Sequence, residues 1–115
     1  MPLKSRSKTI TRNPAWIGPA IPPGEILLEE FLKPLDMGQV VAARHLEISL
    51  NRLNEIVLGK RRITADTALR LAKYFGTSSL FWMNVQAKYD LACAEDEALP
   101  LLSRIIAHRP HLAGA

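Results

Sequence analysis

Apolar residues recur three or four positions apart through the middle of the chain, in segments separated by Gly, Pro, Ser and Thr. This spacing predicts amphipathic helices, and no segment shows the strict alternation that is typical of a half-buried strand. We therefore predict an all-α fold, a compact five-helix domain. The helices are expected at about 25–35, 39–46 and 50–58, then from Thr64 to Gly76, and finally from Ser78 to beyond Leu91.

Capping residues support these boundaries. Ser49, Thr64 and Ser78 each stand just before an apolar segment, where a hydroxyl can accept a hydrogen bond from a free N–H group of the first turn. Gly59 and Gly76 are placed to end the preceding helices in a left-handed conformation.

The sequence divides into three parts. Residues 1–21 are basic, contain several prolines and show no helical period, which predicts an N-terminal arm. Residues 22–94 form the helical domain. Residues 95–115 form a C-terminal extension with a short sixth helix at about 98–107.

The segment 39–59 has the pattern of two short helices joined by a tight turn. Small or apolar residues at the inward positions would fill the wedge between the helices and prop the second helix outward, as in a helix-turn-helix motif. These inward residues are Ala43, Leu46, Ile48, Leu53 and Ile56. One residue departs from the pattern, because Glu47 stands where such a turn usually has glycine, and a left-handed residue with a Cβ costs roughly 1–2 kcal/mol.

Polar side chains of the second of these helices suit DNA recognition. Arg, Asn and Glu can each pair with a base edge in the major groove, while amides, hydroxyls and basic groups near helix ends can hold phosphates. The predicted base-contacting residues are Asn51, Arg52, Asn54 and Glu55. The predicted phosphate-contacting residues are Gln39, Ser49, Lys60, Arg61 and Arg62.

Charge is unevenly distributed around the formal net charge of +4. The arm and the segment 44–73 are basic, whereas the segments 25–36 and 90–97 are acidic. This alternation is typical of a polyanion-binding face with a separate protein-binding face, and an unevenly charged solvated surface is the alternative.

The sequence offers little for catalysis or cofactor binding. The single cysteine, Cys93, excludes an internal disulfide, and His45, His108 and His111 do not have the spacing of a metal site. There is no glycine-rich phosphate loop, so we expect neither an enzyme nor a cofactor. No apolar run approaches the roughly 20 residues of a membrane span, and no secretory signal is evident, which favours a cytoplasmic protein.

The fifth helix is apolar over more than one face. We expect it to pack on the fourth helix and also on a second copy of the chain through Phe81, Trp82, Val85 and Tyr89. Ordinary core packing is the alternative for each of these residues.

Several motifs resemble the HigA-type antitoxins, which belong to the Xre (lambda-repressor-like) helix-turn-helix class. They are Pro23-Gly24-Glu25-Ile26-Leu27, Glu29-Glu30-Phe31-Leu32, Asn51-Arg52-Leu53-Asn54-Glu55-Ile56-Val57, Gly59-Lys60-Arg61, Ile63-Thr64-Ala65-Asp66-Thr67-Ala68-Leu69-Arg70-Leu71-Ala72, Phe75-Gly76-Thr77-Ser78 and Phe81-Trp82. The resemblance covers about residues 22–92. The family usually has His at Pro22, Gly at Glu47 and Pro at Leu50.

The resemblance implies a homodimer that binds a palindromic operator upstream of its own operon and represses it. It also implies a partner, a HigB-type toxin, which is a small ribosome-dependent mRNA endonuclease that the antitoxin neutralises. A stand-alone Xre-family repressor without a toxin is the alternative.

Two surfaces have open assignments. The basic arm, in which Trp16 and Ile17 could pack on the domain or a partner, either reaches an adjacent DNA groove or folds onto the toxin. The acidic segments 25–36 and 90–97 are the better electrostatic match for a basic toxin.

Overall fold

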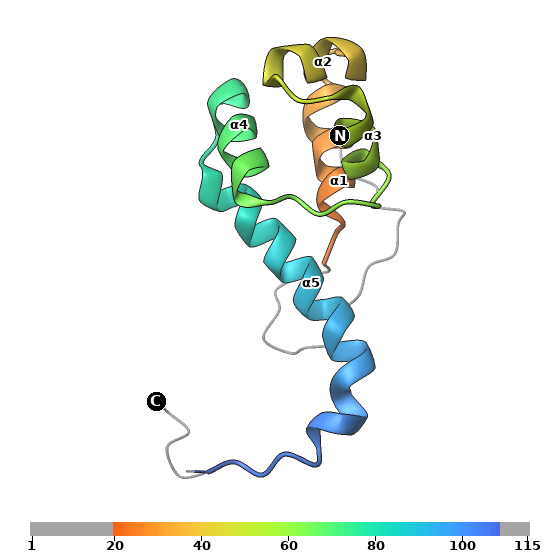
Figure 1. Ribbon diagram of the computed structural model, residues 1–115, viewed down its shortest axis with the longest axis vertical. Coiled ribbons are helices and arrows are strands. Elements are labelled where there is room, and N and C mark those ends of the chain that lie inside the picture. The colour runs from red at the N-terminus through yellow and green to blue at the C-terminus, as the bar shows by residue number, and fades with distance from the viewer. Residues whose placement is uncertain (1–19, 109–115) are drawn as a thin grey trace.

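The computed structural model describes residues 20–108, and all its elements are helices (Figure 1). They are α1 (Pro23–Ile26), η1 (Leu27–Leu32), α2 (Gln39–Leu46), α3 (Leu50–Val57), α4 (Ala65–Phe75) and α5 (Ser79–Leu102). Because α1 runs directly into the π-helical η1, the two form one continuous helix, and the predicted five-helix all-α architecture is confirmed. The arm with Trp16 and Ile17 up to residue 19, and the tail 109–115, lie outside the described residues.

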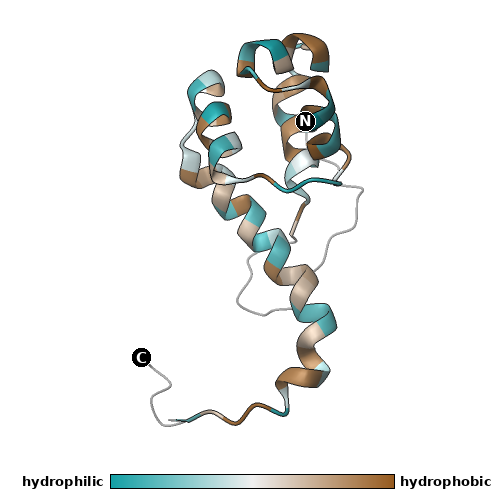
Figure 2. Cartoon of the chain, viewed as in Figure 1, coloured by the Kyte–Doolittle hydropathy of each residue, from teal (hydrophilic) through white to brown (hydrophobic). Residues whose placement is uncertain are grey.

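The first four helices gather at one end of the molecule, and α5 leads away from them toward the C-terminus (Figure 1). Brown apolar and teal polar positions alternate along each ribbon of the cluster, as expected of helices that each bury one face (Figure 2). None of the helices between residues 20 and 108 combines the length and the apolar character that a bilayer crossing requires.

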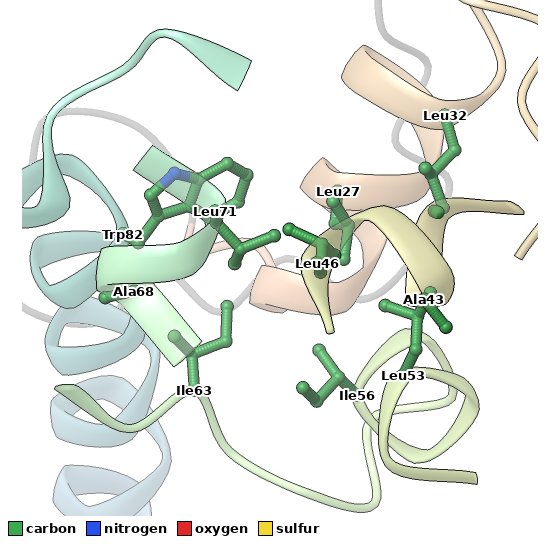
Figure 3. Packing of buried hydrophobic residues seen from close by; sticks show 11 residues of the cluster. Leu27, Leu32, Ala43, Leu46, Leu53, Ile56, Ile63, Ala68, Leu71 and Trp82 are labelled. Carbon is green, nitrogen blue, oxygen red and sulfur yellow. The ribbon is translucent and has the colours of Figure 1, made fainter. Parts of the chain in front are cut away.

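One hydrophobic core joins all the elements (Figure 3). Its largest fully buried side chains are Leu27, Leu32, Leu53, Ile56, Ile63, Leu71 and Trp82. The Trp82 indole is fully buried, and its Nε1 donates a hydrogen bond to Thr77 Oγ1 at 2.7 Å. Trp82 therefore packs inside the domain, and the expectation that it contacts a second copy is corrected in favour of ordinary core.

Gly24 lets the first helix approach α3 at backbone distance. A Cβ at this position would lie 2.0 Å from the Ile56 carbonyl oxygen, so no larger residue fits without moving one of the helices. The predicted start of this helix at residue 25 was slightly late, because Pro23 is already suited to its first turn. The helix ends at Leu32, two residues before Pro34: Lys33 still has helical backbone angles, but Pro34 has no N–H group to continue the hydrogen-bond ladder.

Most of the predicted helix ends are confirmed. Ser49 Oγ accepts a hydrogen bond from Arg52 N and Ser78 Oγ accepts one from Phe81 N, both at 3.0 Å. Gly59 and Gly76 have φ values of 81° and 76°. Thr64 precedes α4 as predicted but makes no cap hydrogen bond.

The predicted sixth helix at about 98–107 is wrong. α5 continues without a break across the proposed 94/95 boundary to Leu102, and residues 103–108 are non-helical and exposed. The acidic segment 95–97 does not interrupt the helix, because Glu95 and Glu97 and the flanking Ala94 and Ala98 are good helix formers that outweigh the single Asp96.

Candidate nucleic-acid interface

The helices α2 and α3 form the predicted helix-turn-helix pair. Ala43, Leu46, Leu53 and Ile56 are all at most 3% exposed, and Ile48 is half-buried in the turn. Glu47 occupies the left-handed region, with φ 58° and ψ 45°. The turn is therefore a tight left-handed one, and it carries the strain of a side chain in a conformation that suits glycine.

Arg70 of α4 holds this turn from outside. Its Nη1 donates to the carbonyl oxygens of Leu46 and Glu47, at 3.0 and 3.2 Å, which are acceptors left open at the end of α2. Its Nε donates to Asp66 Oδ2 at 3.0 Å. Sequence reasoning missed this role of Arg70, because the periodicity of α4 marks the residue only as a polar position.

Arg52 is directed toward α4 rather than away from the core as predicted. Its Nη2 donates to Asp66 Oδ2 and to Thr67 Oγ1, both at 2.7 Å, and its side chain is only 26% exposed. Thr67 is buried, and its hydroxyl also lies 3.4 Å from Thr64 Oγ1. The hydrogen bonds from Arg52 and Arg70 lower the pKa of Asp66 below its ordinary value of 3.8. One carboxylate thus links the recognition helix to the residue that holds the turn.

The outward polar face is formed by Asn51 and Asn54 of α3 together with Gln39 of α2. Asn51 and Asn54 are exposed, and Asn54 Nδ2 donates to Gln39 Oε1 at 3.3 Å. These three residues line a surface hollow with Val40 and Leu50, both largely exposed. The structure therefore brings predicted DNA-contacting side chains from two different helices into one surface hollow.

Basic residues follow α3 in the segment 60–62, and all three are exposed. Arg61 makes an ion pair with Glu55, in which its Nη2 lies 2.6 Å from Glu55 Oε1. Arg62 makes an ion pair with Asp90 of α5. The carboxylate of Glu55 is thus engaged by a neighbouring arginine in this structure.

The predicted dimerisation residues on α5 lie mainly toward the domain. Phe81 is 37% exposed and its ring packs on Phe31 and Trp82, while Val85 and Tyr89 are half-buried. Burial, followed by a hydrogen bond with Cys93, raises the pKa of Tyr89. The more exposed apolar side chains of α5 include Leu80 and Leu91, at 63% and 60%.

Both acidic segments contain carboxylates that are paired with neighbouring side chains. In the segment 25–36, Glu29 pairs with Lys33 at 3.0 Å and Glu30 is exposed. In the segment 90–97, Asp90 is bonded to Arg62 and Gln86.

Among residues 20–108 no group of three His, Cys, Asp or Glu side chains is placed to hold a metal ion.

Comparison with known proteins gives the family. Residues 28–82 match the helix-turn-helix family model. The chain is 53% identical over 79 residues to virulence-associated protein I of Dichelobacter nodosus, covering 69% of this chain and 73% of that protein. A solved structure of the Pseudomonas aeruginosa antitoxin HigA with the higBA promoter is 43% identical with a TM-score of 0.74, and the match covers 77% of this chain and 97% of that one.

The chain belongs to the HigA-type antitoxins of the Xre helix-turn-helix family. An antidote protein of the HigA family from Coxiella burnetii is similarly close, at 44% identity and a TM-score of 0.72, over 76% of this chain and 96% of that one. This is a class of DNA-binding regulators rather than of enzymes.

Proposed function

We propose that this chain is an antitoxin that binds operator DNA upstream of its own operon as a homodimer, represses that operon, and neutralises a HigB-type mRNA endonuclease. One observation carries the DNA-binding part. Gln39 of α2 and Asn51 and Asn54 of the recognition helix α3 line an exposed surface hollow. Arg52 attaches α3 to α4 on the opposite side, and a basic segment follows α3 directly. A solved HigA relative is described with its promoter, which supports the same role here.

We assign direct base contacts to Asn51 and Asn54, whose exposed amides can pair with adenine. Gln39, at the first turn of α2, and Ser49, at the cap of α3, are assigned to phosphates. Lys60 and Arg61 flank the helix on the basic segment and also contact phosphates. Glu55 keeps Arg61 oriented, and Arg52 fixes the helix to α4.

The experiment is titration of the full chain onto its own upstream DNA, with scrambled DNA as the control, at about 150 mM salt. Specific binding with two protomers per site is expected. Asn51→Ala should relax the sequence preference, whereas Lys60→Ala should weaken binding to all sequences and lower the salt slope by about one. Arg104→Ala, which removes a charge beyond the end of α5, is the matched control and should change neither property. Equal weak binding to both DNAs would contradict the repressor function.

The toxin partner separates this proposal from a stand-alone repressor. We propose that a basic toxin docks on an acidic surface, either at Glu29 and Glu30 or at the segment 95–97. Charge reversal at each site, tested separately against a purified HigB-type toxin, should weaken toxin binding for one of the two sites only. If neither reversal changes toxin affinity, the electrostatic assignment is wrong.

A further inference from the structure

The segment that joins α3 to α4 is fixed at both of its ends. At its start, Lys60 N donates to the Glu55 carbonyl oxygen at 2.8 Å and Gly59 has φ 81°, which turns the chain out of the helix. At its end, the Ile63 side chain is fully buried in the core. The three basic residues 60–62 lie between these two fixed points.

Gln86 of α5 holds the second fixed point. It is a buried polar residue, 4% exposed, and its Oε1 accepts a hydrogen bond from Ile63 N at 2.7 Å. Its Nε2 donates to Asp90 Oδ1 at 2.8 Å. The other carboxylate oxygen of Asp90 accepts from Arg62. A chain of hydrogen bonds therefore runs from the Ile63 backbone through Gln86 and Asp90 to the Arg62 guanidinium.

This arrangement satisfies polar groups that would otherwise be costly. A buried backbone N–H without a partner destabilises the fold, and the acceptor for Ile63 N is the side chain of Gln86 rather than a backbone carbonyl. The Gln86 amide uses its acceptor on the segment and its donor on Asp90, so both ends of the side chain are fixed. Residues 86 and 90 lie outside the segment 28–82 that matches the family model.

We propose that Gln86 and Asp90 are positioning residues for DNA binding, and that Arg62 holds the Asp90 carboxylate in place rather than contacting a phosphate. They hold the segment 59–63 in the conformation in which Lys60 and Arg61 meet the DNA backbone. This inference rests on the proposed operator binding. It replaces the expectation that all three basic residues contact phosphates.

The first test needs no DNA. Amide hydrogen exchange, followed by NMR on the full chain, should show Ile63 N exchanging about tenfold faster in Gln86→Met, which keeps the side-chain length but removes both hydrogen bonds. Asp90→Asn keeps an acceptor for Gln86 Nε2 and should leave Ile63 protected. Lys60→Ala is the control and should also leave it protected. Unchanged exchange in Gln86→Met would overturn the proposal. If that variant fails to fold, Asp90→Leu, which removes the acceptor for Gln86 Nε2, should speed the exchange of Ile63, and unchanged exchange there would overturn the proposal instead.

The second test measures how operator affinity depends on salt. Arg62→Ala should weaken binding with no change in the salt slope, because no phosphate contact is lost, whereas Lys60→Ala should lower the slope by about one. If Arg62→Ala lowers the salt slope by about one and Asp90→Asn binds DNA more tightly, Arg62 is a phosphate contact and its proposed role in holding Asp90 is wrong. Failure of the wild-type chain to bind its upstream DNA would instead contradict the proposed function, and the exchange result would still stand.

Discussion

At the scale of single residues, the helix-turn-helix contains a strained residue at its turn. Glu47 has φ 58°, a conformation that L-residues with a Cβ adopt at a cost of roughly 1–2 kcal/mol. The carbonyl oxygens of Leu46 and Glu47 accept hydrogen bonds from Arg70, which holds the turn in this shape despite the strain. The strain is therefore local, and relieving it should not alter the motif.

Replacing Glu47 by glycine should stabilise the protein. Glycine removes the Cβ strain but gains more freedom in the unfolded chain, so the free energy of unfolding should rise by about 0.5–1 kcal/mol, measured by urea denaturation. Glu47→Ala is the matched control, because it removes the charge and keeps the Cβ. If both variants stabilise equally, the carboxylate rather than the backbone conformation is responsible.

Residue chemistry was predictable where it depends on local sequence and less so where it depends on distant partners. Ser49 and Ser78 cap their helices as expected, because a cap bonds only to its own first turn. Arg52 was placed on the wrong side of α3, since its partners Asp66 and Thr67 are 14 and 15 residues away. Helical periodicity assigns each residue to the inward or the outward face of its helix. It does not show which long side chain bends back to contact the next helix.

At the scale of elements, Asp66 connects α3 and α4. It accepts hydrogen bonds from Arg52 of the recognition helix and from Arg70, which also holds the α2–α3 turn. Removing this carboxylate should therefore loosen two elements at once. The ion pairs are exposed to solvent on one side, with Asp66 at 56%, so the effect should be modest and sensitive to salt.

The Asp66 contribution should depend on pH in a defined direction. Both arginines lower the pKa of its carboxyl, so the stabilisation is fully present above the ordinary value of 3.8 and is lost as pH falls through the lower folded pKa. Asp66→Asn should be less stable than wild type at pH 7, and the difference should shrink below about pH 3.8. Thermal unfolding of both proteins across pH 2–7 measures this, with Glu30→Gln as an exposed control. A difference that stays constant with pH would mean that shape, not charge, matters.

Helix positions were predicted more successfully than helix extents. The periodicity and the caps placed α2, α3 and α4 within a residue of their observed bounds. The acidic segment 95–97 predicts a boundary, but α5 runs through it to Leu102, because two of its three residues are glutamates, which favour helix. The polar core residue Gln86 was also missed, because a glutamine between Val85 and Ala87 has no signature of burial until its partner Ile63 N is known.

At the scale of the whole molecule, α5 has two different sides. Trp82 and Gln86 face the domain, whereas a stripe that is exposed except at the half-buried Ala98 repeats at alternating steps of four and three residues. The stripe consists of Leu80, Asn84, Ala87, Leu91, Ala94, Ala98 and Leu101. This is the spacing of a coiled-coil seam, in which small residues allow close approach and a single Asn can set the register. Its leucines are 58–63% exposed, so the stripe is the better candidate for dimerisation than Phe81, Val85 and Tyr89.

Leu91→Lys, at the middle of this seam, should convert the proposed dimer to a monomer, because a charge would be buried between two apolar helix faces. Since a single recognition helix reads only half of a palindromic site, operator affinity should fall with it. Light scattering after size exclusion measures the mass, and the fluorescence of buried Trp82, in a Trp16→Phe background, checks that the domain stays folded. Leu99→Lys is the matched control, because Leu99 is 53% exposed on the same helix but lies off the seam. Dissociation by both variants would point to a general effect of charge on α5, and dissociation by neither would place the dimer interface on another element.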